Sequence, residues 1–194
     1  KMKEQLERIT ISNPRTVFAA ENVRVCDSRG FIAVKDITFG VKQGEILGVA
    51  GIEGNGQDEL TEALVGLQRA ESGKLILNGQ EITGMSIRKR RERGLSHIPA
   101  DRLKRGVVAS CSIWENLMTT QYYKPSFSRL GVMKLRKCSE QAKELIDQYV
   151  IKVPDENYAV STLSGGNMQK VVIARELNIS PDFLIAAQPT RGVD

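Results

Sequence analysis

Residues 45–67 combine an apolar run, a glycine-rich loop and an amphipathic helix, in that order. The apolar run, residues 45–50, is short and ends at Gly51, which predicts a buried strand. The helix is amphipathic because three leucines recur at i, i+4 and i+7: Leu60, Leu64 and Leu67. Gly66 marks its expected end. A strand, a glycine loop and a helix in this order are the context that a phosphate-binding loop requires, so the chain is predicted to be an α/β protein.

The loop keeps the glycines of a phosphate-binding loop but not its charged chemistry. Gly51 and Gly56 fit the first and sixth positions of G-x-x-x-x-G-K-[ST], whereas Gln57 stands at the lysine position and Asp58 at the hydroxyl position. An amide cannot supply the lysine's positive charge. A carboxylate about 4 Å from a phosphate costs roughly 4 kcal/mol at an effective dielectric constant of about 20. A magnesium ion bridging Asp58 to phosphate could offset this cost, so we expect weak or passive nucleotide binding here.

A second glycine-rich helix start occurs at residues 163–167, where Ser164 precedes Gly165 and Gly166. Glycines carry no Cβ, so the backbone N–H groups can approach a ligand closely. The helix behind them adds unpaired donors and the positive end of its dipole, which favours an anion. Ser180-Pro181 ends the helical pattern. We therefore expect a phosphate-facing helix start, with an ordinary glycine turn as the alternative.

The sequences of these segments resemble motifs of the ATP-binding cassette (ABC) ATPases. Leu163-Ser164-Gly165-Gly166-Asn167 is similar to their signature motif, and residues 51–58 lie where their Walker A loop lies. Residues 183–194 resemble the Walker B strand and the start of the D-loop, and residues 94–102 resemble the Q-loop region. The match runs from about Ala19 to Asp194. It is closest to the second cassette of tandem importers of simple sugars and nucleosides, which is commonly degenerate.

The resemblance implies a role for each matching position. The degenerate Walker A residues would be Gly51, Glu53, Gly54, Asn55, Gly56, Gln57, Asp58 and Glu59. The signature, Leu163, Ser164, Gly165, Gly166 and Asn167, would contact ATP held by a partner cassette, with Asp194 in the D-loop. Ala187 stands at the Walker B aspartate position, Gln188 at the general-base position and Ala100 at the Q-loop position. Alanine offers no oxygen to a metal and glutamine is no useful base, so no intact catalytic residue is expected.

The implied fold is a P-loop NTPase core of the ABC type with a small antiparallel β subdomain and a helical insert, truncated at its C-terminus. We expect a linker at residues 1–15 and a nucleotide-binding domain at 16–194. Its core would comprise residues 16–108 and 162–194, and its helical subdomain residues 109–161. Antiparallel strands are predicted at 17–25 and 31–41, with Phe31 in the core, and an Asn-Gly turn after residues 74–77.

The resemblance also implies ATP and magnesium as cofactors, although magnesium would be weakly held or absent in this half-site. The partners would be another cassette, expected in the same polypeptide, and transmembrane permease subunits. The protein would lie peripherally on the cytoplasmic face of the cell membrane. It would help to hydrolyse ATP on its partner and so drive solute uptake, while this chain alone would be weak or inactive.

Two alternatives remain open at this stage. The net charge is +5, and basic residues concentrate at 88–105, which would suit a soluble ABC-type module acting on nucleic acid or ribosomes. A solvated basic helix face capped by Ser86 is the commoner explanation, and no aromatic residue interleaves with these arginines, so we expect no nucleic acid. The other alternative is an ordinary ATPase whose missing groups come from elsewhere. The three scattered cysteines have no metal-binding spacing.

Overall fold

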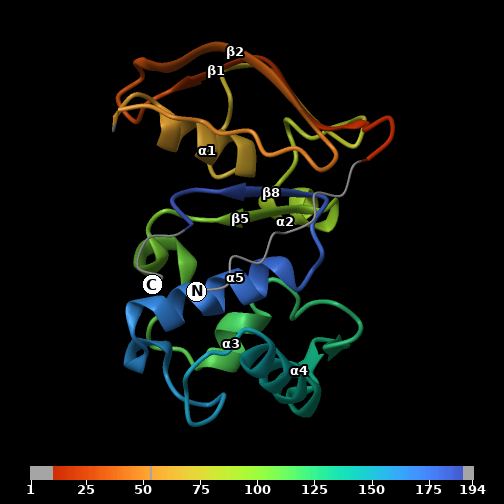
Figure 1. Ribbon diagram of the computed structural model, residues 1–194, viewed down its shortest axis with the longest axis vertical. Helices are drawn as coiled ribbons and strands as arrows, with labels where there is room; N and C mark the ends of the chain where they lie inside the picture. The colour runs from red at the N-terminus through yellow and green to blue at the C-terminus, as the bar shows by residue number, and fades with distance from the viewer. Residues whose placement is uncertain (1–10, 53, 190–194) are drawn as a thin grey trace. The chain divides into compact units, whose positions relative to one another are not determined.

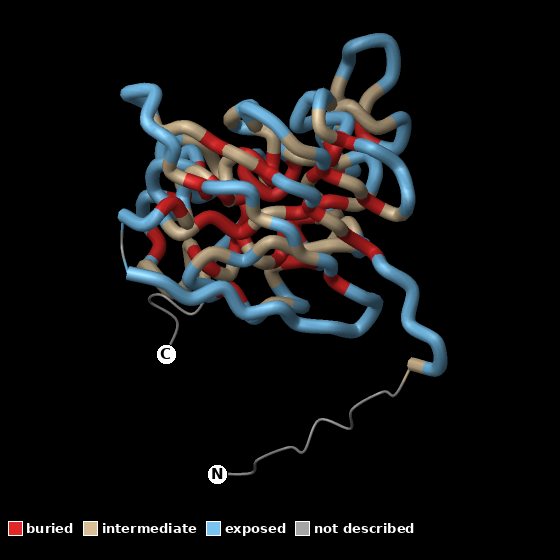
Figure 2. The backbone as a smooth tube through the Cα atoms, turned by 90° about the horizontal axis from the view of Figure 1, so that it is seen from above, coloured by how far each residue is buried: buried red, intermediate tan, exposed pale blue. Residues whose placement is uncertain are grey.

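A computed structural model describes residues 11–52 and 54–189 of the chain (Figure 1). The chain divides into two compact units, residues 1–95 and residues 96–194, and each is described by itself. Buried backbone, drawn red in Figure 2, follows the strands and helices, and the connecting loops are largely exposed. In the described part of the chain, no helix combines the length and the hydropathy needed to cross a membrane.

The first unit is built on an antiparallel sheet with the strand order β2-β1-β3-β4. The strands are β1 (Thr16–Cys26), β2 (Ile32–Lys42), β3 (Ser72–Leu77) and β4 (Gln80–Glu81). Along β1, burial alternates from Phe18 to Ala20 and again from Val23 to Val25, because a register shift between Ala20 and Val23 changes which face the side chains occupy. Asn22 sits in this irregularity with a φ of 49°, a conformation that asparagine tolerates better than most residues. The antiparallel strands predicted at 17–25 and 31–41 and the Asn78-Gly79 turn are confirmed.

Two helices complete the first unit: α1 (Gln57–Val65) and α2 (Ile87–Glu92). Helix α1 buries Leu60, Ala63, Leu64 and Val65. It ends at Gly66, whose φ of 88° and backbone bonds to Glu62 and Ala63 form a glycine C-cap. Ser86 caps α2 and its hydroxyl accepts the Lys89 N–H, as the sequence predicts.

Two expectations for this unit are wrong. Residues 45–50 form no strand, and Ile46 is 96% exposed. An apolar run becomes a strand only where neighbouring strands take up its backbone hydrogen bonds, and none of the described residues pairs with it. Phe31 is 67% exposed rather than in the core, and it lies under the Arg29 guanidinium at 5.4 Å.

The second unit holds one hydrophobic core around three helices, α3 (Ile113–Met118), α4 (Leu135–Gln148) and α5 (Gly165–Leu177). Strand β5 (Leu95–Ile98) begins at the boundary of the units and pairs with β8 (Phe183–Ala186). A π-helix (Arg102–Gly106) and a 3-10 turn (Val160–Thr162) complete the unit, with the hairpin of β6 (Ser128–Arg129) and β7 (Val132–Met133). Residues 119–134, between α3 and α4, are turns and a hairpin within the segment where the helical subdomain is expected.

Candidate functional site

The glycine loop of the first unit leads into α1 without any side-chain cap. Gly56 is the N-cap, with a φ of 90°. A Cβ added to Gly56 would lie 2.5 Å from the Ala33 carbonyl oxygen and 3.3 Å from Val34 Cγ2, so only glycine fits against β2 here. Asp58 and Glu59 occupy the first turn of the helix. The shape of a phosphate-binding loop is present, but its first helical turn is acidic.

Gln57 folds back over its own loop. Its Nε2 donates a hydrogen bond to the Ile52 carbonyl at 3.0 Å. A Cβ added to Gly51 would lie 3.1 Å from Gln57 Cδ, which shows how closely the amide covers that glycine. The amide is thus engaged with the protein backbone and brings no charge to the loop. Gly54 and Asn55 are exposed in the same loop, and Glu53 lies outside the described residues.

The serine-glycine corner of the second unit is built differently. Ser164 is the N-cap of α5, and its hydroxyl accepts the Asn167 N–H at 3.4 Å and the Asn167 side-chain amide at 3.1 Å. Asn167 in turn accepts the Lys152 N–H at 3.0 Å, which ties the first turn to the preceding loop. The N–H groups of Gly165 and Gly166 come too early in α5 to have intrahelical acceptors. No acid lies in this first turn.

Arg102 is a site residue that sequence reasoning missed. A Cβ added to Gly165 would lie 3.2 Å from Arg102 Cζ and closer still to Nη2, so the guanidinium lies against the first glycine of α5. The π-helix that begins at Arg102 is capped by Asp101, whose carboxylate accepts the N–H groups of Leu103 and Lys104. Thus Arg102, just after the Q-loop position, brings a positive charge to the serine-glycine corner, which we also call the signature corner or the α5 corner. In the sequence Arg102 is only one of a run of basic residues.

The predicted Walker B position lies at the edge of the β5-β8 pair. The Ala187 N–H donates to the Ile98 carbonyl at 2.9 Å, so the Walker B position lies beside the strand that leads to Ala100. The Gln169 amide of α5 donates to the Pro189 carbonyl at 3.3 Å. Gln188 is exposed and has a φ of 47°. Helix α5, which begins at the predicted signature, thus contacts the segment after β8 through Gln169. Asp194 lies outside the described residues.

A buried arginine, Arg90, holds α2 against the end of α1 in the first unit. Arg90 of α2 is 3% exposed. It donates to the Ala63 and Leu64 carbonyls at the end of α1 and to the Thr83 and Met85 carbonyls in the segment before α2. Burial lowers the pKa of its guanidinium. Arg88 of the same helix pairs with Glu92 at 2.9 Å. Part of the basic stretch is thus committed to structure, which weakens its interpretation as a nucleic-acid surface.

In the second unit, Arg175 and Glu176 form a buried ion pair at 2.9 Å. Arg175 also donates to the Gly106 carbonyl at 2.8 Å, while Glu176 accepts the His97 N–H at 3.3 Å. The Ser96 hydroxyl donates to the Glu176 backbone carbonyl at 3.0 Å. The pair therefore locks α5 to β5 and to the end of the π-helix. Sequence spacing alone carries no signal for it.

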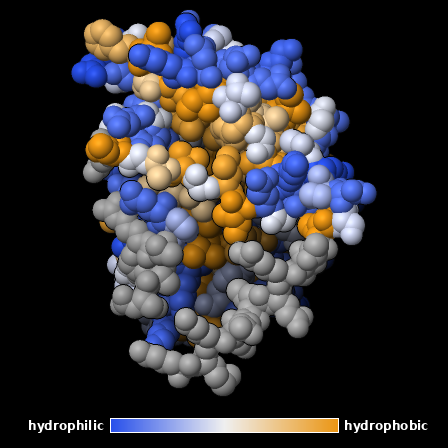
Figure 3. Space-filling view, turned by 45° about the horizontal axis from the view of Figure 1, so that its top comes forward, coloured by the Kyte–Doolittle hydropathy of each residue, from blue (hydrophilic) through white to orange (hydrophobic). Residues whose placement is uncertain are grey.

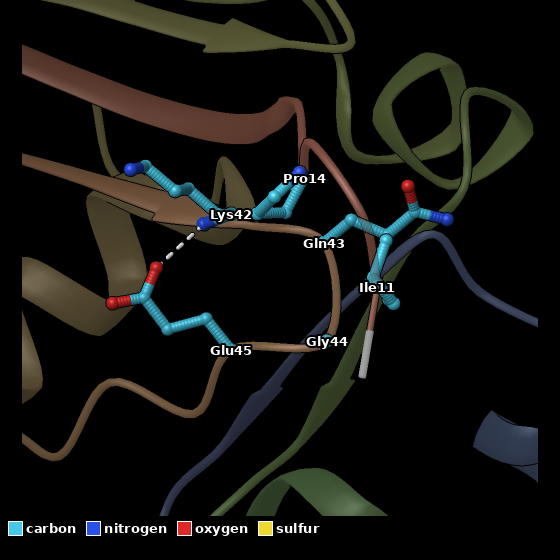
Figure 4. Close-up of a pocket in the computed structure, with 6 residues that line it drawn as sticks. All are labelled: Ile11, Pro14, Lys42, Gln43, Gly44 and Glu45. Carbon is cyan, nitrogen blue, oxygen red and sulfur yellow. Dashed lines mark hydrogen bonds between the residues drawn. The ribbon is translucent and has the colours of Figure 1, made fainter. Parts of the chain in front are cut away.

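A shallow hollow of about 300 Å³ lies at the end of β2 (Figure 4). Its lining residues are Ile11, Pro14, Lys42, Gln43, Gly44 and Glu45. Figure 4 shows the Glu45 carboxylate already accepting the Lys42 backbone N–H, at 2.7 Å. None of these residues belongs to the predicted site, and we assign no ligand to the hollow.

The comparisons with known proteins agree with this arrangement. The family model described as ABC transporter matches residues 34–191. The chain belongs to the ABC transporter family. Among solved structures, a dimeric ATP-binding cassette bound to ADP and phosphate superposes with a TM-score of 0.75 at 21% identity, covering 91% of this chain and 76% of that one. A nucleotide-free cassette gives a TM-score of 0.71 at 19% identity, covering 92% and 71%. The fold is therefore the P-loop NTPase fold of an ABC cassette, with its antiparallel β subdomain.

Relatives of the ABC family match a similar share of the chain. The guanosine import ATP-binding protein NupO of Bacillus subtilis is 47% identical over 178 residues, which are 92% of this chain and 35% of that protein. The nucleoside import ATP-binding protein NupA of Lactococcus lactis is 41% identical over 178 residues, with the same coverage of 92% and 35%. The chain spans about a third of the length of these curated relatives.

An ABC ATPase fold implies ATP with magnesium, and the two corners fit that ligand unequally. The glycine loop offers Gln57 and Asp58 in place of a lysine and a hydroxyl. Within residues 11–52 and 54–189, no three His, Cys, Asp or Glu side chains cluster as a metal site. The corner at Ser164 offers free backbone donors, a helix dipole and the Arg102 guanidinium, which suit a phosphate. The α5 corner therefore has groups suited to contact a phosphate, while the α1 loop has an amide and a carboxylate where the motif has a lysine and a hydroxyl.

Proposed function

We propose that this chain is the second, degenerate cassette of a tandem ABC importer for nucleosides or simple sugars. Its own loop would hold nucleotide weakly or not at all. Its signature corner would complete the ATP site of the first cassette. The two cassettes would then close on ATP at the cytoplasmic face of the membrane and pass this movement to the transmembrane permease subunits. The names of the relatives NupO and NupA support the importer class and nucleosides as the first substrates to test.

One observation carries the proposal: the two glycine-rich helix starts have opposite chemistry. The α1 start has two acidic residues in its first turn, and the Gln57 side-chain amide is hydrogen-bonded to the loop backbone. The α5 start has no acid in its first turn, a side-chain cap and an arginine against its first glycine. Donors and positive charge held in place before the reaction stabilise developing phosphate charge without reorganisation. The chain is thus equipped to assist hydrolysis on a partner rather than to perform it.

The residues of the chain would divide the work in the following way. The N–H groups of Gly165 and Gly166 and the Ser164 hydroxyl would donate to the terminal phosphate of ATP held by the partner. Arg102 would neutralise charge beside them. Ala187, Gln188 and Ala100 would leave this chain's own half-site without a base or a metal ligand.

Uptake of guanosine by the complete transporter tests the proposal. Gly165→Asp places a carboxylate where the phosphate would lie and displaces Arg102, so uptake should fall about 100-fold or more. Gln57→Ala is the matched control in the other corner and should leave uptake nearly unchanged, because the amide is folded onto its own loop. Normal uptake by Gly165→Asp, with the protein present at the membrane, would refute the role of the signature corner. Equal loss in both variants would show that the α1 loop is also active.

A further inference from the structure

The hairpin segment, residues 127–137, exposes large apolar side chains at its tip. Leu130 is 96% exposed, Val132 70% and Leu135 60%. Figure 3 shows one face of the molecule, where hydrophobic residues reach the surface among hydrophilic ones. Isolated exposed leucines are common, but Leu130 and Val132 lie together on one short hairpin, and Leu135 begins the helix that follows it.

The hairpin is firmly held from its inner side. Phe127 is buried and Met133 packs against the core of the second unit, as does Cys138 just beyond the segment. The Lys134 N–H donates to the Phe127 carbonyl at 2.8 Å, and the strands pair in register from Ser128 with Met133. The alternation of β7 therefore directs Met133 inward and Val132 outward. The exposed face belongs to an ordered hairpin beside the start of α4 (Figure 1).

Leu130 adopts a left-handed backbone conformation that is unfavourable for leucine. Its φ is 50°, and Gly131 follows with a φ of 80°. Both values suit a two-residue hairpin turn in which asparagine, aspartate or glycine is normally preferred. A leucine here bears backbone strain and gains no packing in return, since its side chain is almost fully exposed. A side chain that breaks a local rule without a gain in folding points to binding.

The charged residues of the hairpin segment itself, residues 127–137, are all basic. No acidic residue occurs between Glu115 and Glu140, and this interval contains the basic residues Lys124, Arg129, Lys134, Arg136 and Lys137. Glu140 is itself paired with Arg136 at 2.9 Å, and Lys134 donates to the Pro125 carbonyl at 2.8 Å. Arg129 and Lys137 are exposed. The aliphatic tip is thus bordered by positive charge.

We propose that the hairpin segment binds an anionic lipid surface, with Leu130 and Val132 entering the headgroup region and the flanking basic residues meeting lipid phosphates. Aliphatic tips with basic borders match such a surface in both polarity and charge. Nucleic acid would use the same charges but normally adds aromatic stacking, and the exposed residues at this tip are Leu and Val. The inference concerns a surface of the second unit and does not rest on the signature role proposed above.

Flotation of the purified protein with vesicles tests this surface. Binding should be strong on phosphatidylcholine mixed with phosphatidylglycerol, weak on phosphatidylcholine alone, and reduced by added salt. Arg129→Gln with Lys137→Gln should weaken binding about 25-fold, since each basic side chain near an anionic membrane contributes roughly fivefold. Lys35→Gln with Lys74→Gln removes two exposed charges from the β2 and β3 strands and is the matched control, expected to bind like the parent.

Leu130→Asn separates binding from folding. Asparagine accepts the left-handed backbone, so the melting temperature should stay equal or rise, while vesicle binding should fall about tenfold. Phe31→Ser is the control for loss of an exposed apolar side chain elsewhere and should not weaken binding. Unchanged vesicle binding by Leu130→Asn, equal binding to neutral vesicles, or equal loss in the control pairs would overturn the proposal. So would retention of a DNA oligonucleotide that depends on Arg129 and Lys137 with no binding to anionic vesicles.

Discussion

The two glycine-rich helix starts of this ABC cassette are built by different means. The α1 start depends on glycine and backbone: Gly56 fits where a Cβ would meet the Ala33 carbonyl, and no side chain caps the helix. The α5 start depends on side chains, through the Ser164 cap and the Arg102 guanidinium. A loop shaped by glycines can keep its form after its charged residues change, whereas a corner shaped by side chains requires each of them. The α5 corner therefore depends on more side-chain contacts than the α1 corner.

The largest expected effect concerns the ion pair that holds α5 in place. Arg175→Met leaves the Glu176 carboxylate buried without its cation, which should lower the free energy of unfolding by about 3–5 kcal/mol. Adding Glu176→Gln should restore part of this loss, because no unpaired charge then remains buried. Urea unfolding of both variants measures the difference. A single variant as stable as the parent would show that the α5 corner does not depend on this side-chain pair.

The next effect tests the backbone-built corner. Gly56→Ala forces an alanine into a φ of 90° and against the Ala33 carbonyl, so we expect a loss of about 2–4 kcal/mol in stability. Gly54→Ala is the matched control, since Gly54 has a φ of 88° but open space around it and should lose only about 1 kcal/mol. Thermal unfolding separates the two. Equal losses would mean that backbone conformation alone, and not the contact with β2, shapes the loop.

The sequence predicts the parts of both corners that depend on local pattern. Apolar spacing predicts α1, glycine predicts its end at Gly66, and the glycine pair after Ser164 predicts the start of α5. Two contacts that hold the α5 corner and its helix join residues far apart in the chain, so no local pattern reveals them. Arg102 against Gly165 and Gly106 against Arg175 are of this kind.

The failed predictions have the same physical origin. Residues 45–50 have the composition of a strand, but strand formation also requires paired neighbours. The aromatic ring of Phe31 favours the core by its hydrophobicity, yet the position in the chain at the start of β2 leaves it exposed under Arg29. The roles of the site residues, including Gln188 and Asp58, stay predictions that rest on the family resemblance.

The smallest expected effect asks whether charge alone separates the two corners. Gln57→Lys keeps the loop's glycines and replaces the neutral amide by a cation that can reach a phosphate. If the α1 loop has kept its shape and lost only its charge, the variant should bind a fluorescent ATP analogue about tenfold more tightly than the parent, or about 1.4 kcal/mol. Gln57→Met, of similar length and without charge, is the control and should bind no better than the parent.

Hydrolysis should not follow from this gain in binding. Ala187, Gln188 and Ala100 still lack a metal ligand and a base, so phosphate release by the Gln57→Lys variant should stay at the level of the parent. Tighter binding without turnover would show that this half-site has two separate defects: weak nucleotide binding at the α1 loop and missing catalytic groups at the end of β8. Tighter binding accompanied by magnesium-dependent turnover would instead show that Gln57 alone keeps this cassette inactive, and the contrast between the two corners would reduce to a single side chain.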